Sequence, residues 1–163
     1  MASKLKVLAV CDGNAFRSPL FAALLLKALE KRKIFAVEVF SAGLKESLKT
    51  NRSCSGACEE ALAFAARDEL DLTAHCRKHI SEISHLETFG MVICMDPRHC
   101  GHLQAAEVEQ RQIWIANESA GGIEDPHGEG PAEHQRCFDL LQREAVIIAD
   151  HIEIEHFDHA EEV

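Results

Sequence analysis

Short, largely apolar runs alternate with longer segments of helical period, and this alternation constrains the fold more than any other feature of the sequence. The runs have the length of strands and lie at 7–10, 36–40, 91–95 and 113–115. Apolar strands that alternate with helices are typical of a parallel sheet whose two faces are both covered. The pattern therefore predicts an α/β fold of three layers, α/β/α, around a central parallel sheet of four strands.

The segments between these runs predict helices. Ser18 and Pro19 have the character of an N-cap followed by a first helical residue, and the apolar stretch 20–29 continues from them. Apolar side chains recur at helical spacing over 57–65, and 138–152 have the period of an amphipathic helix. Loops are expected at 44–56 and at the Gly- and Pro-rich segment 121–131.

A chain of 163 residues has the length of one ordinary domain. No repeat or linker divides it, so we expect one domain over 1–155 and an acidic, His-rich tail over 156–163. The formal net charge of -10 has the wrong sign for binding nucleic acid or an anionic membrane. The sequence shows neither a signal peptide nor an apolar stretch of membrane-spanning length, so the expected location is cytoplasmic.

The segment Cys-Asp-Gly-Asn-Ala-Phe-Arg-Ser-Pro at 11–19 has the composition of an anion-binding loop. It joins the first strand to the first helix, at the strand end where α/β folds bind ligands. Gly13 and Asn14 accept left-handed backbone, so the loop can aim its N–H groups inward beside the helix N-terminus. Arg17 adds a planar guanidinium that matches a tetrahedral oxyanion.

Cys11 lies at the base of this loop. A helix N-terminus and a nearby arginine favour the thiolate form of a cysteine, and the Ser18 hydroxyl can donate a hydrogen bond to it. A thiolate beneath a bound phosphate can accept the phosphoryl group and later release it to water. The alternative is a buried cysteine that serves only packing. The glycine turn and the predicted helix start favour the anion site.

The pattern Cys-x5-Arg-Ser-Pro after a first strand resembles the bacterial type of the low-molecular-weight protein tyrosine phosphatases. Four later segments follow in the family's order, namely Ser-Ala-Gly at 41–43, Asp-Leu-Thr-Ala-His at 71–75, Met-Asp at 95–96 and Asp-Pro at 125–126. The resemblance implies hydrolysis of phosphotyrosine-type monoesters through a cysteinyl-phosphate intermediate, without a cofactor or a metal. It implies a phosphorylated protein or a small aryl phosphate as partner, and a monomer or weak dimer.

The resemblance also implies roles for individual residues. Cys11 is the nucleophile, Arg17 the phosphate clamp and Asp125 the general acid and base. The phosphate-binding loop comprises Asp12, Gly13, Asn14, Ala15, Phe16, Arg17 and Ser18, and its supporting network comprises Asn14, Ser18, Ser41 and His75. From the residues alone, Asp96-Pro97 and Asp125-Pro126 compete for the position of the acid, and the resemblance favours Asp125.

Two loop residues depart from the family's pattern. Family members usually have a hydrophobic or small neutral residue in place of Asp12, whose carboxylate repels a phosphate dianion and disfavours a thiolate. Asp12 therefore points to solvent, selects a substrate with a positive neighbour, or weakens the enzyme. Many members have a second cysteine in place of Phe16, so a protective disulfide with Cys11 is not expected here. Phe16 can instead line the site.

Three other functions fit parts of the sequence. A thioredoxin-coupled arsenate reductase needs relay cysteines near the third strand, where Cys94 and Cys100 lie without an upstream partner. A protein-arginine phosphatase tends to have Thr in place of Ala15. A weakly active pseudo-phosphatase that only binds phosphate would explain Asp12, but not the joint presence of Cys11, Arg17 and Asp125.

Cysteine and histidine also occur in groups that suggest a metal site. The groups are Cys54 with Cys58, then His99, Cys100 and His102, and the late histidines His151, His156 and His159. None of them has a standard zinc spacing. We interpret them as surface histidines and core cysteines.

Overall fold

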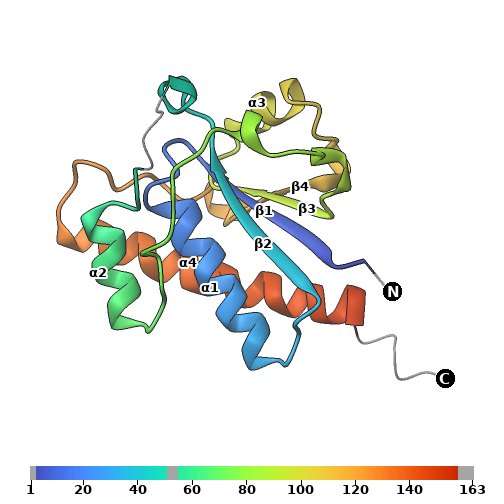
Figure 1. The fold of residues 1–163 in the computed structure, drawn as a ribbon. Coiled ribbons are helices and arrows are strands. Elements are labelled where there is room, and N and C mark those ends of the chain that lie inside the picture. The colour runs from blue at the N-terminus through green and yellow to red at the C-terminus, as the bar shows by residue number, and fades with distance from the viewer. Residues whose placement is uncertain (1–2, 51–54, 158–163) are drawn as a thin grey trace.

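The computed structural model describes residues 3–50 and 55–157. One sheet of four parallel strands has the order β2-β1-β3-β4, and its members are β1 (Leu5–Cys11), β2 (Val37–Gly43), β3 (Met91–Cys94) and β4 (Ile113–Ile115). Helices lie on both faces (Figure 1), with α1 (Arg17–Lys31), α2 (Glu59–Arg67) and α4 (Pro131–Ile152) on one side and α3 (His99–Ala105) on the other. The predicted α/β/α fold with four parallel strands is confirmed.

Two apolar cores lie on opposite faces of the sheet because successive strand residues point to opposite sides. In β1, Val7 and Ala9 belong to the core that α1 and α4 cover, whereas Leu8 and Val10 belong to the core on the side of α3. Burying one large apolar side chain stabilises a fold by about 1.5–3 kcal/mol. Residues 7–11 of β1 are all buried, so this end of the strand is a firm base for the loop that follows it.

Strands and helices lie within a few residues of their predicted positions, with informative differences. α1 begins at Arg17 with Phe16 as its N-cap, so the prediction that Ser18 caps this helix is wrong. The predicted loop 44–56 contains a 3-10 helix over Glu46–Thr50, and its residues 51–54 lie outside the described residues. α3 has no counterpart among the predicted elements, because seven residues are too few for a helical period to be evident.

The C-terminal helix is longer than its periodicity predicts. α4 starts at Pro131, which occupies the first turn, where its missing N–H costs nothing. One turn of π-helix over Glu153–Phe157 continues from it. Residues 158–163 of the predicted tail lie outside the described residues, so the boundary at 155 stays a prediction.

Backbone hydrogen bonds join the segments that follow β1, β2, β3 and β4. The N–H groups of Leu44 and Lys45 donate to the Asp12 carbonyl at 3.1 and 2.9 Å, which holds the loop after β1 against the segment after β2. The Ile123 N–H donates to the Met95 carbonyl at 2.7 Å, which holds the loop after β4 against the end of β3. Segments far apart in the sequence are thereby held together at the carboxyl ends of the strands.

Gly122 permits the close approach of the loop after β4 to the end of β3. Its φ is +102°, and a Cβ at this position would lie 2.6 Å from the carbonyl oxygen of Met95. The neighbouring Gly121 also has a positive φ of +86°, but a Cβ there would meet no atom of the described residues within 4 Å. Both glycines therefore need a positive φ, but only at Gly122 would a Cβ clash with other backbone atoms.

We expect Gly122→Ala to destabilise the protein more than Gly121→Ala. Both substitutions place a side chain at positive φ, at a cost of about 1 kcal/mol, but only the first adds a clash with backbone. Urea unfolding should show a loss of unfolding free energy about 2 kcal/mol larger for Gly122→Ala. Equal losses for the two variants would contradict this role of Gly122.

Candidate active site

The loop between β1 and α1 leaves its backbone donors unused. The N–H groups of residues 12–16 donate to no partner within the ranges 3–50 and 55–157. The first turn of α1 adds further N–H groups that no helical carbonyl can accept. Asn14 is in the left-handed region, with φ 52°, as expected for a sharply curved loop. Free amides beside a helix N-terminus suit the binding of an anion.

Cys11 ends β1 at the base of this loop and is buried. Its Sγ lies 3.0 Å from the Oγ of the buried Ser18, which is the contact that the sequence predicted. The Asn14 Nδ2 donates to the same Oγ at 2.9 Å, so the Ser18 hydroxyl hydrogen remains available for the sulfur or for the Ala42 carbonyl at 3.4 Å. This commitment explains why the Ser18 hydroxyl does not cap α1.

Asn14 is the centre of a hydrogen-bond network behind the loop. Its Nδ2 also donates to the Ser41 Oγ at 3.0 Å, and its Oδ1 accepts from the Lys78 N–H at 3.0 Å. Its carbonyl oxygen lies 2.8 Å from the Nε2 of His75. Burial lowers the pKa of His75, which favours a neutral ring whose Nε2–H donates to that carbonyl. The structure thus brings Asn14, Ser18, Ser41 and His75 together.

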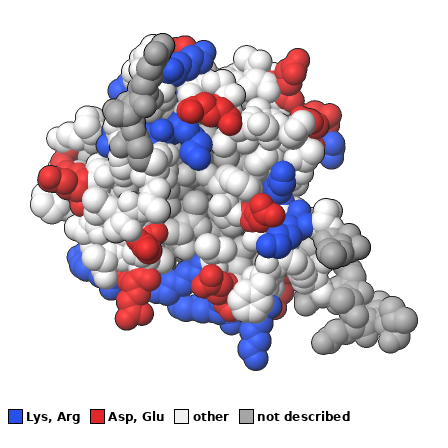
Figure 2. Space-filling view, viewed as in Figure 1, with Lys and Arg blue, Asp and Glu red and all other residues white. Residues whose placement is uncertain are grey.

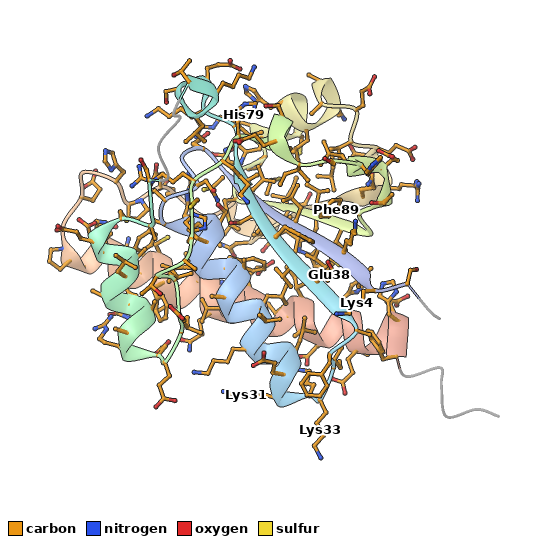
Figure 3. All side chains as sticks on the ribbon, in the orientation of Figure 1. Lys4, Lys31, Lys33, Glu38, His79 and Phe89 are labelled. Carbon is orange, nitrogen blue, oxygen red and sulfur yellow. The ribbon has the colours of Figure 1, made fainter. Side chains whose placement is uncertain are left out.

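Gly43 lets the loop and the segment 75–79 approach β2 at the same point. Its N–H donates to the Lys78 carbonyl at 2.9 Å, and it pairs with His79, whose position is visible in Figure 3. A Cβ on Gly43 would lie 2.7 Å from the Asp12 carbonyl oxygen and 2.5 Å from the Leu48 side chain. The Ser-Ala-Gly segment therefore serves the site through its small size as well as through Ser41.

Arg17 joins the loop after β1 to the loop after β4. Its side chain is 3% exposed, and a buried guanidinium needs partners to offset its lost hydration. Nη1 donates to the Ile123 carbonyl at 2.9 Å. Nη2 lies 3.2 Å from Oδ2 of Asp12 and 3.7 Å from Oδ2 of Asp125. Asp125 is thus brought to the mouth of a loop more than a hundred residues earlier.

The Asp12 carboxylate is engaged on both of its oxygens. Oδ2 accepts from Arg17, and Oδ1 lies 3.1 Å from the Nε2 of His99 at the start of α3. The Asp12 side chain is 49% exposed, so it reaches solvent as the first alternative expects, but both of its oxygens also have protein partners. The interpretation of His99 as a surface histidine is wrong, because this first residue of α3 is buried.

The two Asp-Pro pairs have different surroundings. Asp96 Oδ2 accepts from the Arg98 side chain at 2.6 and 3.0 Å, and Oδ1 accepts from the Arg98 N–H at 2.8 Å. These hydrogen bonds lower the pKa of Asp96 to about 2, so it carries no proton at neutral pH. Asp125 Oδ1 accepts from the His127 N–H at 3.1 Å, while Oδ2 faces Arg17.

The lowered pKa of Asp96 predicts a pH-dependent contribution to stability. Folding favours its ionised form, so the contribution is present above the ordinary pKa of 3.8 and is lost as the pH falls toward 2. Arg98 is 84% exposed, and solvent screening limits the effect to about 1 kcal/mol. Urea unfolding of Asp96→Asn should show this loss in full at about pH 7 and only about a third of it at about pH 2.5. An equal loss at both pH values would contradict the ion pair as its cause.

Phe16 packs into the core and does not line the mouth of the loop. Its ring meets Phe64 edge-on at 5.9 Å between centroids and His134 edge-on at 5.3 Å. Its side chain is buried among residues of α1, α2 and α4. The interpretation that Phe16 lines the site is therefore wrong, because its ring is buried against Phe64 and His134. It fastens the loop to the larger core.

Cys137 lies close to the site, but no sequence motif marks it as a site residue. Burial in α4 raises its pKa to about 12, and the charges of Arg17, Asp125 and Cys11 are near enough to act on it. With Ile123 and Asp125 it lines a cavity of about 550 Å³ between α4 and the loop after β4. Its place on an amphipathic helix marks it only as a core residue.

Most of the described cysteines are free thiols. They comprise Cys11, Cys58, Cys94, Cys100 and Cys137, whereas Cys76 is disulfide-bonded. Within 3–50 and 55–157, no three His, Cys, Asp or Glu side chains are grouped so that they could hold a metal ion. Cys54 and His159 of the groups considered above lie outside those ranges. Nor is any helix of the described part of the chain long and apolar enough to cross a membrane.

An anion held by the loop amides and Arg17 would have the Cys11 sulfur beneath it, as in a cysteine-dependent phosphatase. Comparison with known proteins agrees with this class. The model of the family "Low molecular weight phosphotyrosine protein phosphatase" matches residues 6–156, which is nearly the whole chain. The chain belongs to this family, as the resemblance of its motifs implied.

A relative supports the same assignment, and solved structures share the fold. The low molecular weight protein-tyrosine-phosphatase Wzb of Salmonella typhi is 30% identical over 143 residues, which cover 86% of this chain and 89% of Wzb. A YwlE mutant from Bacillus subtilis has the same fold, with a TM-score of 0.78, 22% identity and coverage of 92% and 99%. Vibrio vulnificus Wzb in complex with benzylphosphonate has a TM-score of 0.77, 21% identity and coverage of 90% and 98%.

Proposed function

We propose that this protein tyrosine phosphatase uses Cys11 as its nucleophile, Arg17 as its phosphate clamp and Asp125 as its general acid and base. The observation that carries the proposal is the position of Arg17. Its Nη2 lies at the mouth of a loop of unused amides and 3.7 Å from the Asp125 carboxylate. A phosphoryl group bound there would be in reach of the nucleophile, the clamp and the acid.

In the first step the Cys11 thiolate attacks phosphorus, a P–S bond forms and the bond to the leaving oxygen breaks. The electron pair of that bond goes to the leaving oxygen, which takes a proton from Asp125. In the second step Asp125 removes a proton from water, which attacks phosphorus and expels the thiolate. Inorganic phosphate leaves, and no oxidant or cofactor is consumed.

Together with Arg17, the loop amides of residues 12–18 donate hydrogen bonds to the equatorial oxygens of the phosphoryl group. There they stabilise the negative charge that develops in the transition state. Nη1 of Arg17 is held by the Ile123 carbonyl, which leaves Nη2 turned toward the phosphate position. Asn14, Ser41 and His75 act as positioning residues, because their hydrogen bonds maintain the curve of the loop. Ser18 donates to the sulfur and stabilises its charge when it leaves.

The choice of Asp125 over Asp96 follows from their surroundings. A general acid must hold a proton when the substrate binds, and a carboxyl with a pKa of about 2 does not. Asp96 is committed to Arg98, whereas Asp125 is half-exposed and faces the mouth of the loop. We therefore assign Asp96 a structural role at the start of α3.

We further propose a cytoplasmic protein whose substrates are phosphorylated proteins, with small aryl phosphates accepted as well. Its phosphatase domain spans 1–155, and it acts as a monomer or weak dimer. The free thiols named above suit a reducing compartment, and the disulfide-bonded Cys76 is the exception among the described cysteines. Light scattering over a range of protein concentrations measures the oligomeric state.

Two relatives of this chemistry serve as comparisons in the assay. Solved structures described as YwlE arginine phosphatase share the fold at 22% and 24% identity. An arsenate reductase would need Cys94 as a relay thiol, but burial raises the pKa of Cys94 to about 12, which makes it a poor nucleophile. Phosphoarginine and arsenate are therefore the informative alternative substrates.

The proposed function predicts phosphatase activity that depends on Cys11. Para-nitrophenyl phosphate and a phosphotyrosine peptide should be turned over, and Cys11→Ser should lower kcat by at least about a thousandfold. Arsenate should not drive thioredoxin oxidation. Activity that survives in Cys11→Ser, or a higher kcat/KM for phosphoarginine than for phosphotyrosine, would contradict the proposal. No turnover of any ester would favour the phosphate-binding pseudo-phosphatase.

The acid assignment predicts a dependence on the leaving group. Asp125→Asn should lower kcat by about a hundredfold or more for phenyl phosphate, whose leaving group needs a proton. The loss should be much smaller for para-nitrophenyl phosphate, whose leaving group departs as the anion. Asp96→Asn is the matched control and should stay within a few-fold of the parent on both esters. A loss that depends on the leaving group in Asp96→Asn, and not in Asp125→Asn, would assign the role of general acid to Asp96.

A further inference from the structure

Asp12 is a charged residue of the site that the proposed reaction does not use. We propose that Asp12, positioned by His99, selects substrates that carry a positive charge beside the phosphoryl group. The inference rests on the function proposed above and deepens it, since it names the substrate class. Its chemical form is a phosphotyrosine peptide with lysine or arginine next to the phosphorylated residue.

The Asp12 carboxylate is held by two buried partners and is itself partly exposed to solvent. Its two partners are almost completely buried, with side chains of Arg17 and His99 that are 3% and 4% exposed. The Asp12 side chain itself is 49% exposed. Two directed contacts, at 3.2 and 3.1 Å, therefore hold a half-exposed negative charge at one orientation. A fixed charge discriminates between substrates better than one on a mobile side chain.

Asp12 and Asp125 share one nitrogen of Arg17. Nη2 lies 3.2 Å from the first carboxylate and 3.7 Å from the second, and both carboxylates are about half-exposed. When a phosphoryl dianion binds, it takes over the charge of this guanidinium, and Asp12 loses its cationic partner. A cation on the substrate can then replace it, whereas an acidic neighbour adds repulsion.

His99 orients Asp12 without neutralising it. Its Nδ1 is buried and has no hydrogen-bond partner among the described residues, so the ring's single hydrogen belongs on Nε2 and is donated to Asp12. Burial lowers the pKa of His99, although the nearby Asp12 and Asp96 oppose this effect and Arg17 adds to it. A neutral donor leaves the full negative charge of Asp12 available to the substrate.

Within 3–50 and 55–157, no lysine or arginine other than Arg17 forms an ion pair with Asp12. Arg98 is close enough for its charge to be felt by Asp12, but its guanidinium is bound to Asp96 at 2.6 Å. On the face seen in Figure 2, basic and acidic side chains are interspersed and form no patch of one sign. On this face, therefore, no broad patch of one sign adds to the effect of the local carboxylate.

The test compares kcat/KM for phosphotyrosine peptides that differ only in their flanking residues, which are lysine, alanine or glutamate. We expect the parent protein to favour the lysine peptide over the glutamate peptide by about tenfold. Asp12→Asn should reduce this ratio to about twofold or less. It should do so chiefly by improving the glutamate peptide, because the repulsion is removed.

A matched control separates Asp12 from the net charge of -10, which favours basic peptides in general. Glu129→Gln changes the net charge by the same amount at an exposed position in the loop that carries Asp125. It should keep the tenfold ratio. A ratio that is unchanged in Asp12→Asn, or that falls equally in Glu129→Gln, overturns the proposal, as does a parent protein without preference.

The role of His99 is tested by a pair of substitutions. His99→Gln keeps an N–H donor near the position of Nε2 and should keep most of the charge preference, whereas His99→Leu should lose it. If the leucine variant does not fold, as judged by circular dichroism, the Asp12 and glutamine variants decide alone. Para-nitrophenyl phosphate turnover shows separately whether the catalytic assignment holds. Turnover without charge preference refutes only this inference, while absent turnover refutes the proposed function.

Discussion

The left-handed backbone of Asn14 and the hydrogen bonds around it are the constraint on which the site depends. A residue at φ 52° is uncommon outside glycine, and asparagine accepts this region more readily than most side chains. Here the side-chain amide is fully used by Ser18, Ser41 and the Lys78 N–H. Because these partners come from three separate segments, the curve of the loop is maintained by the whole fold and not by the loop alone.

The buried Arg17 imposes a second constraint that acts on the opposite side of the loop. A guanidinium that is 3% exposed must be paired, and its partners here are the Ile123 carbonyl and two carboxylates. The pairing draws the loop after β4 over the helix N-terminus, and Gly122 allows that loop to pass close to the end of β3. Asn14 therefore maintains the curve of the loop after β1, and Arg17 determines where the loop after β4 lies.

Most of the fold could be predicted from the sequence because buried strands and amphipathic helices leave a periodic apolar pattern. The predicted strand over 113–115 agrees with the structure residue for residue. α3 has no such pattern, because its seven residues include histidines, a glycine and a glutamine. The bounds of α1 also differ, since the Ser18 hydroxyl serves Cys11 and Asn14 instead of the helix start.

The site was predictable where its residues are close in sequence and less so where they meet only in space. The loop from Cys11 to Ser18 is one continuous motif, so its residue types identify its chemistry directly. His99 and Cys137 reach the site from α3 and α4, and nothing in their neighbouring residues marks them. The ring of Phe16 shows the same limit, because its direction depends on Phe64 and His134, which no local pattern connects to it.

Three aspartates near one loop illustrate how partners, and not residue type, divide the chemistry. Asp96 has three hydrogen bonds from Arg98, so its proton is lost far below neutral pH and its charge is already balanced. Asp125 accepts from the His127 N–H and has a longer contact with Arg17, at 3.7 Å, so its half-exposed carboxylate is less firmly paired than that of Asp96. Asp12 is held by a neutral imidazole, which fixes its direction and leaves its charge for the substrate. In the proposed mechanism, the same type of side chain thus serves as a structural ion, an acid and a charge selector.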